Sequence, residues 1–291
     1  MKYSRVTIGN ILANIRQAKK CSADIYHITG DVHYLVLGLP PRRTLLTIHD
    51  CVFLYAASGL KRRLLKWLLL DMPVRRSRLV TTISEATRQD ILHFTGCSPQ
   101  KVVVIPDPVS DTIRYSPAGF RTEEPVILFM GTTDNKNLSR VAQALKGISC
   151  RLEIVGQLNA DQKRALTDQA IRYNQQSGLS DEQVAAAYAN ADLVLFPSTF
   201  EGFGLPIVEA QKSGRPVITS DLSPMKEVAG GAAHLVDPYN VESIREGVLS
   251  VMQQPNYRQQ LVEKGLANVH RFSTRAIAAQ YLECYNKLAN Q

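Results

Sequence analysis

The feature that most constrains the fold of this chain is a regular alternation, between residues 126 and 238, of short apolar runs with helix-like segments. Runs rich in β-branched residues occupy 126–131, 150–156, 192–198, 216–220 and 233–238, and helical patterns lie at 137–147, 181–191 and 206–214. Continuous apolar strands separated by amphipathic helices are typical of parallel βαβ units, whose sheet is covered on both faces. This part of the chain is therefore predicted to form a doubly wound α/β domain.

The first part of the chain repeats this pattern more loosely, with strand candidates at 24–30, 44–50, 78–84 and 102–108. The segment 110–125 contains Pro, Gly and charged residues without an apolar period, which is typical of an interdomain linker. The predicted fold class is thus α/β, with two Rossmann-like doubly wound parallel-sheet domains. We predict an N-terminal domain over 1–112, a second domain over 113–272, and a C-terminal helix over 273–291 that is capped by Ser273 or Thr274 and packs back toward the N-terminal domain.

The net charge of +8 lies entirely in the first 112 residues, which hold 16 of the 34 Lys and Arg but only 8 of the 26 Asp and Glu; the remainder holds 18 of each. The first domain is therefore expected to meet an anionic partner. The chain contains no run of about 18 apolar residues and no secretory signal pattern. Its five scattered cysteines include no C-x-x-C pair, so neither a disulfide framework nor a zinc site is indicated. The expected location is the cytoplasm.

Two loops that follow strands are suited to an anionic ligand, because ligands of open parallel sheets bind beyond the carboxyl ends of the strands. In the first loop, Lys136 immediately precedes Asn137, which is placed to cap the next helix. A helix N-terminus with a lysine beside it is suited to a phosphate. Taken alone, this loop favours the alternative of a solvated lysine in a surface turn.

The second loop reads FEGFGLPIVE. Gly202 and Gly204 let the backbone approach a ligand, and Pro206 is expected to be the first residue of a helix. Two anion cradles on one sheet suggest a diphosphate. Glu209 is expected in the first helical turn, where a carboxylate is favourable and can accept hydrogen bonds from ribose hydroxyls, whereas Glu201 lies in the loop. An alternative in which the glutamates are a dipole partner and a surface charge leaves both glycines unexplained.

The segment 126–238 resembles the nucleotide-binding domain of the family 4 (group 1) retaining glycosyltransferases of GT-B architecture. Members share two glutamates separated by seven residues around a GFGLP-like turn, here Glu201 and Glu209. The resemblance continues through ILFMGTTDNKNL, EIVG, YANADLVLFPS, EVAGG, LVDP and FSTRAIAAQYLECY, and in the first domain through TLLTIHD, TTISEATRQDI and VVVIPDPV. It implies transfer of a sugar from a nucleotide-diphosphate donor to an acceptor hydroxyl with retention, in surface polysaccharide or glycolipid synthesis.

The resemblance also implies roles for individual residues. In the family, the lysine after the first strand contacts the donor diphosphate, which corresponds to Lys136, and the second glutamate holds the ribose, which corresponds to Glu209. The first glutamate and the backbone of the following turn lie against the donor sugar. The implied donor site consists of Gly131, Thr132, Lys136, Asn137, Gly202, Phe203, Gly204, Leu205 and Glu209. The implied catalytic residues are Glu201, Lys136 and, at the end of TLLTIHD in the first domain, His49.

The sequence departs from the family in two ways. Thr132 and Thr133 stand where many members carry an arginine, so the diphosphate charge is expected to rest on Lys136 and backbone dipoles. Members usually open with a strand, a glycine-rich loop and a helix, and here the chain starts at or after that helix. We therefore expect a shortened N-terminal domain, and a non-catalytic nucleotide-sugar-binding or partner subunit is the alternative function.

Other chemistries fit the motifs less well. The chain contains no D-x-D motif, so we expect neither a metal nor a cofactor beyond the nucleotide-diphosphate sugar that serves as co-substrate. A glycosidase needs two carboxyl groups flanking the scissile bond, and the helical placement of Glu209 beside a phosphate cradle argues against that role. A phosphorylase or a nucleotide-sugar epimerase could share the architecture, but the motif favours transfer.

The basic segment 60–78 is predicted to be an amphipathic helix. Arg62, Arg63 and Lys66 share one face, and the other face carries Leu64, Leu65, Trp67 and Leu68. This is the layout of a helix resting on an anionic membrane surface, and it would suit a lipid-linked acceptor and a peripheral position on the inner face of the cell membrane. A helix that packs its apolar side on the sheet is the alternative. Aromatic interleaving and nucleic-acid motifs are absent, so no nucleic-acid partner is expected.

Overall fold

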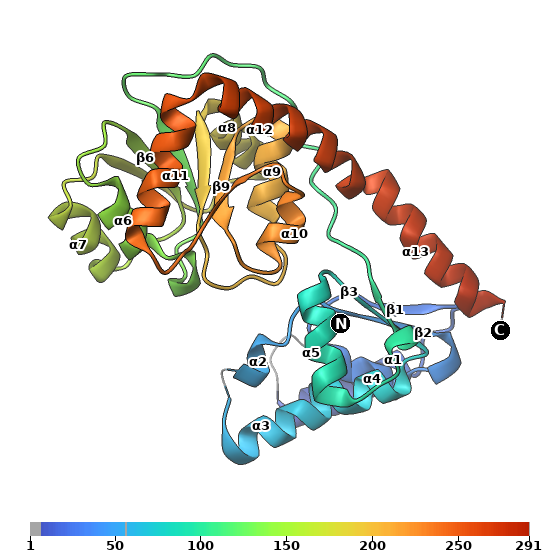
Figure 1. Cartoon of the computed structure of the whole chain (residues 1–291). Helices are drawn as coiled ribbons and strands as arrows, with labels where there is room; N and C mark the ends of the chain where they lie inside the picture. Colours follow the sequence, from blue (N-terminus) through green and yellow to red (C-terminus); the bar gives the residue numbers. More distant parts are fainter. Residues whose placement is uncertain (1–6, 56, 291) are drawn as a thin grey trace. The chain divides into compact units, whose positions relative to one another are not determined.

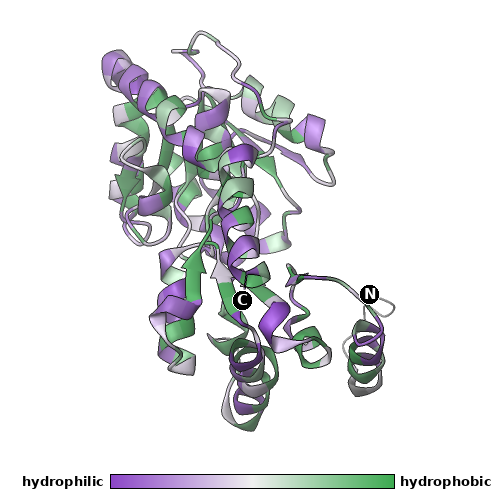
Figure 2. Ribbon diagram, turned by 90° about the vertical axis from the view of Figure 1, so that its right-hand side faces the viewer, coloured by the Kyte–Doolittle hydropathy of each residue, from purple (hydrophilic) through white to green (hydrophobic). Residues whose placement is uncertain are grey.

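The structure, a computed structural model, describes residues 7–55 and 57–290. The chain divides into two compact units, the first formed by residues up to Pro106 together with those from Ile277 onward, and the second by Asp107–Ala276 (Figure 1). Each unit is built around its own parallel sheet. In Figure 2 the helices carry both hydrophilic and hydrophobic residues, as expected of helices that cover a sheet with one side.

Within residues 7–55 and 57–106, the sheet of the first unit has four parallel strands in the order β1-β2-β3-β4. They are β1 (Tyr26–Ile28), β2 (Thr44–Ile48), β3 (Leu79–Thr82) and β4 (Val102–Val104). Each lies inside one of the four predicted strand segments. In the register, Leu46 of β2 lies opposite Ile28 of β1 and Val80 of β3. All five residues of β2 are buried, as expected of an inner strand covered on both faces.

Helix α1 (Ile8–Ala18) precedes β1, and short helices connect the strands that follow. They are η1 (His33–Gly38), η2 (Pro41–Arg43), α2 (Val52–Tyr55), α3 (Gly59–Lys66), η3 (Trp67–Asp71), α4 (Met72–Arg76), α5 (Glu85–Thr95) and η4 (Pro99–Lys101). The helix predicted over 60–78 therefore contains a π-helical turn, η3, and ends at Arg76. Pro73 causes this irregularity, because it has no N–H to donate to the carbonyl of Leu69. The ring Nδ1 of His33 satisfies that carbonyl instead, at 2.7 Å.

The C-terminal helix α13 (Thr274–Ala289) begins after Ser273, whose Oγ accepts the N–H of Ala276. Most of the helix belongs to the first unit, where Ile277, Cys284 and Leu288 pack against Leu45 and Ile105. This apolar contact joins the end of the chain to the sheet of the first unit.

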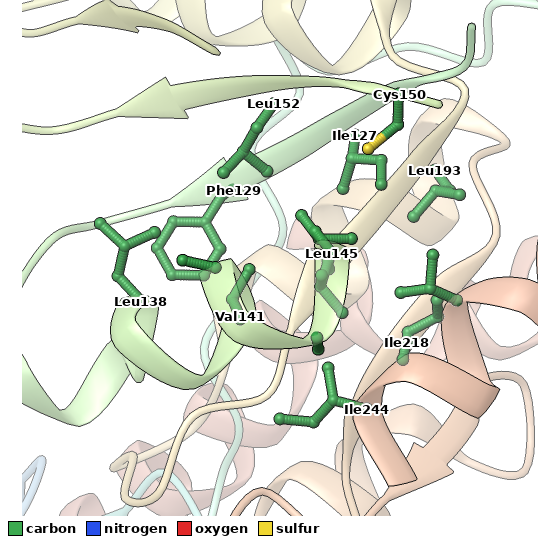
Figure 3. Packing of buried hydrophobic residues seen from close by; sticks show 14 of the residues in the cluster. Ile127, Phe129, Leu138, Val141, Leu145, Cys150, Leu152, Leu193, Ile218 and Ile244 are labelled. Atoms are coloured by element: carbon green, nitrogen blue, oxygen red, sulfur yellow. The ribbon is translucent and has the colours of Figure 1, made fainter. Parts of the chain in front are cut away.

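The second unit has a six-stranded parallel sheet in the order β10-β9-β8-β5-β6-β7. The strands are β5 (Val126–Met130), β6 (Arg151–Val155), β7 (Tyr173–Gln176), β8 (Leu193–Phe196), β9 (Val217–Ser220) and β10 (His234–Val236). The helices are η5 (Asp134–Lys136), α6 (Leu138–Leu145), α7 (Ala160–Asp168), α8 (Asp181–Asn190), α9 (Leu205–Ser213), α10 (Met225–Ala229), α11 (Val241–Gln253), α12 (Pro255–Asn268) and η6 (Val269–Phe272). The core lies between the sheet and its helices, with Ile127 and Phe129 of β5 near Val141 and Leu145 of α6 (Figure 3).

The units divide between Pro106 and Asp107, whereas the sequence placed the boundary near residue 112. Local hydrogen bonds explain why 107–112 belongs with the second unit. The N–H of Val109 donates to the carbonyl of Phe272, and Asp111 accepts from Lys212 Nζ at 3.1 Å.

Candidate functional site

The candidate site lies beyond the neighbouring strands β5 and β8 of the second sheet, where the strand order reverses. From β5 the chain proceeds through β6 to β7 on one side of the sheet, and from β8 through β9 to β10 on the other. In open parallel sheets, the crevice beyond the carboxyl ends of such strands is where ligands bind. The loops that follow β5 and β8 are the two loops singled out from the sequence.

An ion pair joins these two loops. Lys136 Nζ lies 2.6 Å from Glu201 Oε1, and the two side chains are only 15% and 14% exposed. Asn135 reinforces the connection, because its side-chain amide donates to the carbonyl of Phe200 at 2.8 Å and to Glu201 Oε1 at 3.2 Å. The structure thus brings together Lys136 and Glu201, which are 65 residues apart in the sequence.

The Lys136 side chain lies against the end of β8 and against Gly131, the residue that follows β5. Lys136 Nζ lies 4.5 Å from the centroid of the Phe196 ring at the end of β8, a cation–π distance. Gly131, directly after β5, has φ +85°, and a Cβ added there would lie 2.8 Å from Lys136 Cε. Glycine at 131 therefore provides both the backbone conformation and the space for the lysine side chain.

The turn after Glu201 leads into α9. Gly204 occupies the N-cap position of α9 with φ +107°, which favours glycine. Helix α9 begins at Leu205, so Pro206 is its second residue and not its first as expected. Phe203 is buried and packs edge-to-face on Phe272, with ring centroids 5.6 Å apart. Its backbone, rather than its ring, is thus the part available to a ligand, and Gly202 lies in the same turn.

Glu209 is the fifth residue of α9, so its predicted position in the first turn was wrong. The helix starts one residue before Pro206, which moves the carboxylate into the second turn. Its Oε2 accepts a hydrogen bond from the hydroxyl of Tyr188 in α8 at 2.7 Å. Burial raises the pKa of Glu209 above its ordinary value, while this hydrogen bond partly offsets the rise. The carboxylate is therefore a largely buried acceptor with a fixed orientation.

Two residues that were predicted to bind the nucleotide-sugar donor, Asn137 and Thr132, form side-chain hydrogen bonds to backbone carbonyls of the protein. Asn137 stands at the N-cap of α6 but makes no side-chain cap bond, contrary to expectation. Its positive φ of 70° turns the amide toward the carbonyls of Pro197 and Pro238, at 3.1 and 2.6 Å. Thr132 Oγ1 donates to the carbonyl of Gln157 at 2.9 Å. Both side chains hold the loop after β5 in place.

His49 belongs to the first unit and directly follows β2, at the carboxyl end of that sheet. Its ring is half-buried, and its carbonyl accepts a hydrogen bond from Thr87 Oγ1 at 3.2 Å. The other predicted catalytic residues, Lys136 and Glu201, lie in the second unit.

Sequence reasoning missed Asn135 and Tyr188. Asn135 stands one residue before the lysine in TTDNKN, and Tyr188 opens the matched motif YANADLVLFPS. Both positions were part of the family pattern. An aromatic residue on a helix is ordinarily assigned to the core, and nothing in the local sequence indicates which group accepts from the Tyr188 hydroxyl.

The basic helix α3, together with Trp67 at the start of η3, presents an apolar stripe to solvent. Leu60, Leu64 and Trp67, spaced along one face, are 81%, 60% and 50% exposed, whereas Leu65 and Leu68 are partly buried. Lys66, expected to face an anionic membrane surface with Arg62 and Arg63, pairs with Asp71 at 2.7 Å. In the part of the chain that the structure describes, no helix is long and apolar enough to cross a membrane. Among the same residues, no group of three or more His, Cys, Asp or Glu could hold a metal ion.

Two family models match the chain. The model described as glycosyl transferases group 1 matches residues 114–267, and the model described as Glycosyltransferase Family 4 matches residues 1–112. The two matches together span both units.

Characterised relatives agree with these models. The MMP alpha-(1->4)-mannosyltransferase of Mycolicibacterium hassiacum is 30% identical over 219 residues, which cover 71% of this chain and 53% of that protein. The O-antigen chain mannosyltransferase B of Escherichia coli is 27% identical over 290 residues, covering 91% of this chain and 74% of that protein. The chain thus spans about half the length of the first relative and about three quarters of the second.

The same fold is found in solved structures. Anabaena HepE, solved in complex with UDP and glucose, has a TM-score of 0.78 at 18% identity, covering 95% of this chain and 81% of that one. At this identity the likeness shows the fold alone, which is the GT-B fold of two Rossmann-like units. Together with the family models and the relatives, it shows that this chain belongs to the glycosyl transferases group 1 family.

Proposed function

We propose that this chain transfers a hexose from a nucleotide-diphosphate donor to an acceptor hydroxyl with retention at the anomeric carbon. The names of the relatives, mannosyltransferases in both cases, make mannose the first candidate. The observation that carries the proposal is the ion pair between Lys136 and Glu201 at the junction of β5 and β8, with the oriented carboxylate of Glu209 on the adjoining helix.

Each of these groups suits one part of the donor. Lys136 would contact the diphosphate, and one cation about 4 Å away at an effective dielectric of about 20 offers up to roughly 4 kcal/mol of gross Coulomb attraction. The N–H groups of the turn at Gly202 and Gly204, and those at the start of α9, would add partial positive charge. Glu209 would accept hydrogen bonds from the ribose hydroxyls.

Departure of the diphosphate is the difficult part of the reaction, because negative charge develops on the leaving oxygen. Groups aimed at that charge before the reaction starts stabilise the transition state. Lys136 is such a group, since Glu201 and the Phe196 ring hold its side chain, and Asn135 in turn holds Glu201. Glu201 would also lie against the donor sugar. We propose that this chemistry requires neither a metal ion nor a further cofactor.

We also propose a membrane-proximal acceptor, in surface polysaccharide or glycolipid synthesis. Escherichia coli mannosyltransferase B is named for the O-antigen chain, and a relative from Mycobacterium leprae is a phosphatidyl-myo-inositol mannosyltransferase. The exposed stripe of Leu60, Leu64 and Trp67, with Arg62 and Arg63 exposed on the same helix, is suited to an anionic membrane surface.

A thermal-shift panel of nucleotide-diphosphate sugars that differ in base and hexose, followed by a transfer assay, tests the function. One sugar nucleotide is expected to raise the melting temperature and to support transfer with a retained anomeric configuration in the product. Transfer is expected to persist in the presence of a chelator. Absence of any shift across the panel would contradict the proposal, and binding without transfer to any acceptor would favour a non-catalytic nucleotide-sugar-binding subunit.

A further inference from the structure

Tyr188 of α8 makes a direct contact with Glu209 of the candidate site. Its side chain is fully buried, at 0% exposure, and its hydroxyl donates to Glu209 Oε2 at 2.7 Å. The contact joins α8 to α9, which are neighbours in the second unit. A buried hydroxyl and a buried carboxylate each lose water on folding, so each needs a partner, and here each is the partner of the other.

The bond fixes the direction of the carboxylate. A glutamate side chain has three rotatable bonds, and one hydrogen bond to a rigid ring removes most of that freedom. Because the tyrosine occupies Oε2, the remaining acceptor capacity of the carboxylate lies mainly on Oε1.

A second contact fixes the tyrosine itself. Arg215, which is 4% exposed, follows Gly214 at the end of α9. Its Nε donates to the carbonyl of Tyr188 at 3.1 Å, and its Nη2 donates to the carbonyl of Ala189 at 2.6 Å. These are carbonyls of the last turn of α8, where a cation is favourable. Helices α8 and α9 are therefore tied twice, once through Arg215 and once through the hydroxyl on Glu209.

We propose that Tyr188 is a positioning residue that aims Glu209 at the ribose of the donor and thereby gives the site its preference for ribonucleotides. This inference rests on the proposed function, because it assumes that Glu209 meets the ribose. A carboxylate held in one orientation can accept from a hydroxyl at one place on the sugar ring. A freely rotating carboxylate would gain less from that hydroxyl, since it must be ordered on binding.

The variant Tyr188→Phe tests the proposal, because it removes the hydroxyl and keeps the ring that fills the core. The measurement is the ratio of calorimetric affinities for a ribonucleoside diphosphate and for its 2′-deoxy and 3′-deoxy analogues. The preference for the ribonucleotide is expected to fall about tenfold, the scale of one hydrogen bond to a charged group, while the affinity for the weaker-binding analogues changes little. In Tyr257→Phe, which loses a hydroxyl contact to His234 at 2.9 Å in the same unit, the ratio is expected to stay at the wild-type value.

A double-mutant cycle separates positioning from a general loss of packing. If Tyr188 acts through Glu209, Tyr188→Phe has no further effect on the ratio once Glu209→Gln is present. If Tyr188→Phe does not fold, Arg215→Lys replaces it in the test. A lysine lacks the planar guanidinium group that donates to both carbonyls, so Arg215→Lys is expected to lower the same affinity ratio by a smaller factor.

The outcomes distinguish the two proposals. An unchanged ratio in Tyr188→Phe, with wild-type binding that still depends on Glu209, would overturn the positioning role and leave the function standing. If Tyr188→Phe does not fold, an unchanged affinity ratio in Arg215→Lys would overturn the positioning role. A wild-type protein that binds no nucleoside diphosphate would overturn both proposals.

Discussion

At the scale of single residues, the compensated charge of Lys136 is the central feature of the site. Its ammonium group lies 2.6 Å from Glu201, so a carboxylate of the protein already lies where a diphosphate oxygen is proposed to bind. Opposite charges at this distance attract, and a second anion must share the lysine with the first. Glu201 therefore positions the lysine and at the same time weakens its attraction for the donor.

The variant Glu201→Gln separates these effects. Removal of the carboxylate charge is expected to leave the affinity for a nucleoside diphosphate unchanged or to raise it by up to about tenfold, because Lys136 then carries an uncompensated charge. Transfer is expected to fall, since the lysine and the sugar lose a positioned partner. Calorimetry measures the affinity and a transfer assay measures the activity. Glu246→Gln, on the exposed side of α11, is the matched control. Affinity lost as severely as transfer would show that Glu201 itself holds the nucleotide.

At the scale of elements, a polar chain ties α13 to the first sheet. Tyr285 of α13 bonds His27 Nδ1 at 2.8 Å, His27 Nε2 bonds Thr47 Oγ1 at 2.7 Å, and Thr47 bonds Thr81 at 2.7 Å. This series of hydrogen bonds crosses β1, β2 and β3 and ends on the C-terminal helix. Burial lowers the pKa of His27 to about 4, so the ring is neutral when the network is formed.

This network makes the stability of the protein depend on pH. The histidine pKa is about 6.5 in the unfolded chain and about 4 when folded, so the unfolded state binds more protons between these values. The stability that His27 contributes is complete above about 6.5 and is lost as the pH falls toward 4. The melting temperature is therefore expected to fall over this range, and to fall less in His27→Gln. Equal pH slopes in the two proteins would contradict this account.

The exposed stripe of α3 leads to a prediction about membranes. Replacing Arg62 and Arg63 by Gln is expected to weaken sedimentation with anionic vesicles about tenfold or more, because each basic residue near such a surface contributes about 1 kcal/mol. Trp67→Ser is expected to weaken it as well, through the loss of buried apolar area. The double variant Lys163→Gln/Arg164→Gln, on the exposed side of α7, is the control. Equal sedimentation with anionic and neutral vesicles would remove the membrane proposal.

The elements also show how far the sequence could predict this protein. Apolar runs located nine of the ten strands in the described part of the chain, because buried parallel strands are continuously hydrophobic. The strand β7 was missed because it reads YNQQ and lies at the sheet edge, where alternate residues face solvent. Glu209 was placed one turn too early, since the exact start of α9 depends on the φ of Gly204. The hydroxyl of Tyr188 could not be paired, because its partner lies on another helix.

At the scale of the whole molecule, the two units differ in charge and in the residues they contribute. The excess positive charge lies in the first unit's part of the sequence, which also carries His49 and the exposed stripe of α3. The second unit carries Lys136, Glu201 and Glu209 at one junction of its sheet. Donor binding is thus proposed to belong to the second unit, and the membrane-facing surface to the first.

The most direct measurement is a calorimetric titration of a nucleoside diphosphate into the wild-type chain, Lys136→Ala and Glu209→Ala, with Lys163→Ala and Glu246→Ala as controls. Each site variant is expected to weaken binding at least about tenfold, because a hydrogen bond to a charged group contributes roughly 1.5–3 kcal/mol. Both site variants are expected to remain folded, with a lower melting temperature for Lys136→Ala, because that change leaves the 14% exposed Glu201 without its cation. Binding of unchanged affinity in both site variants would contradict the donor site proposed for this chain.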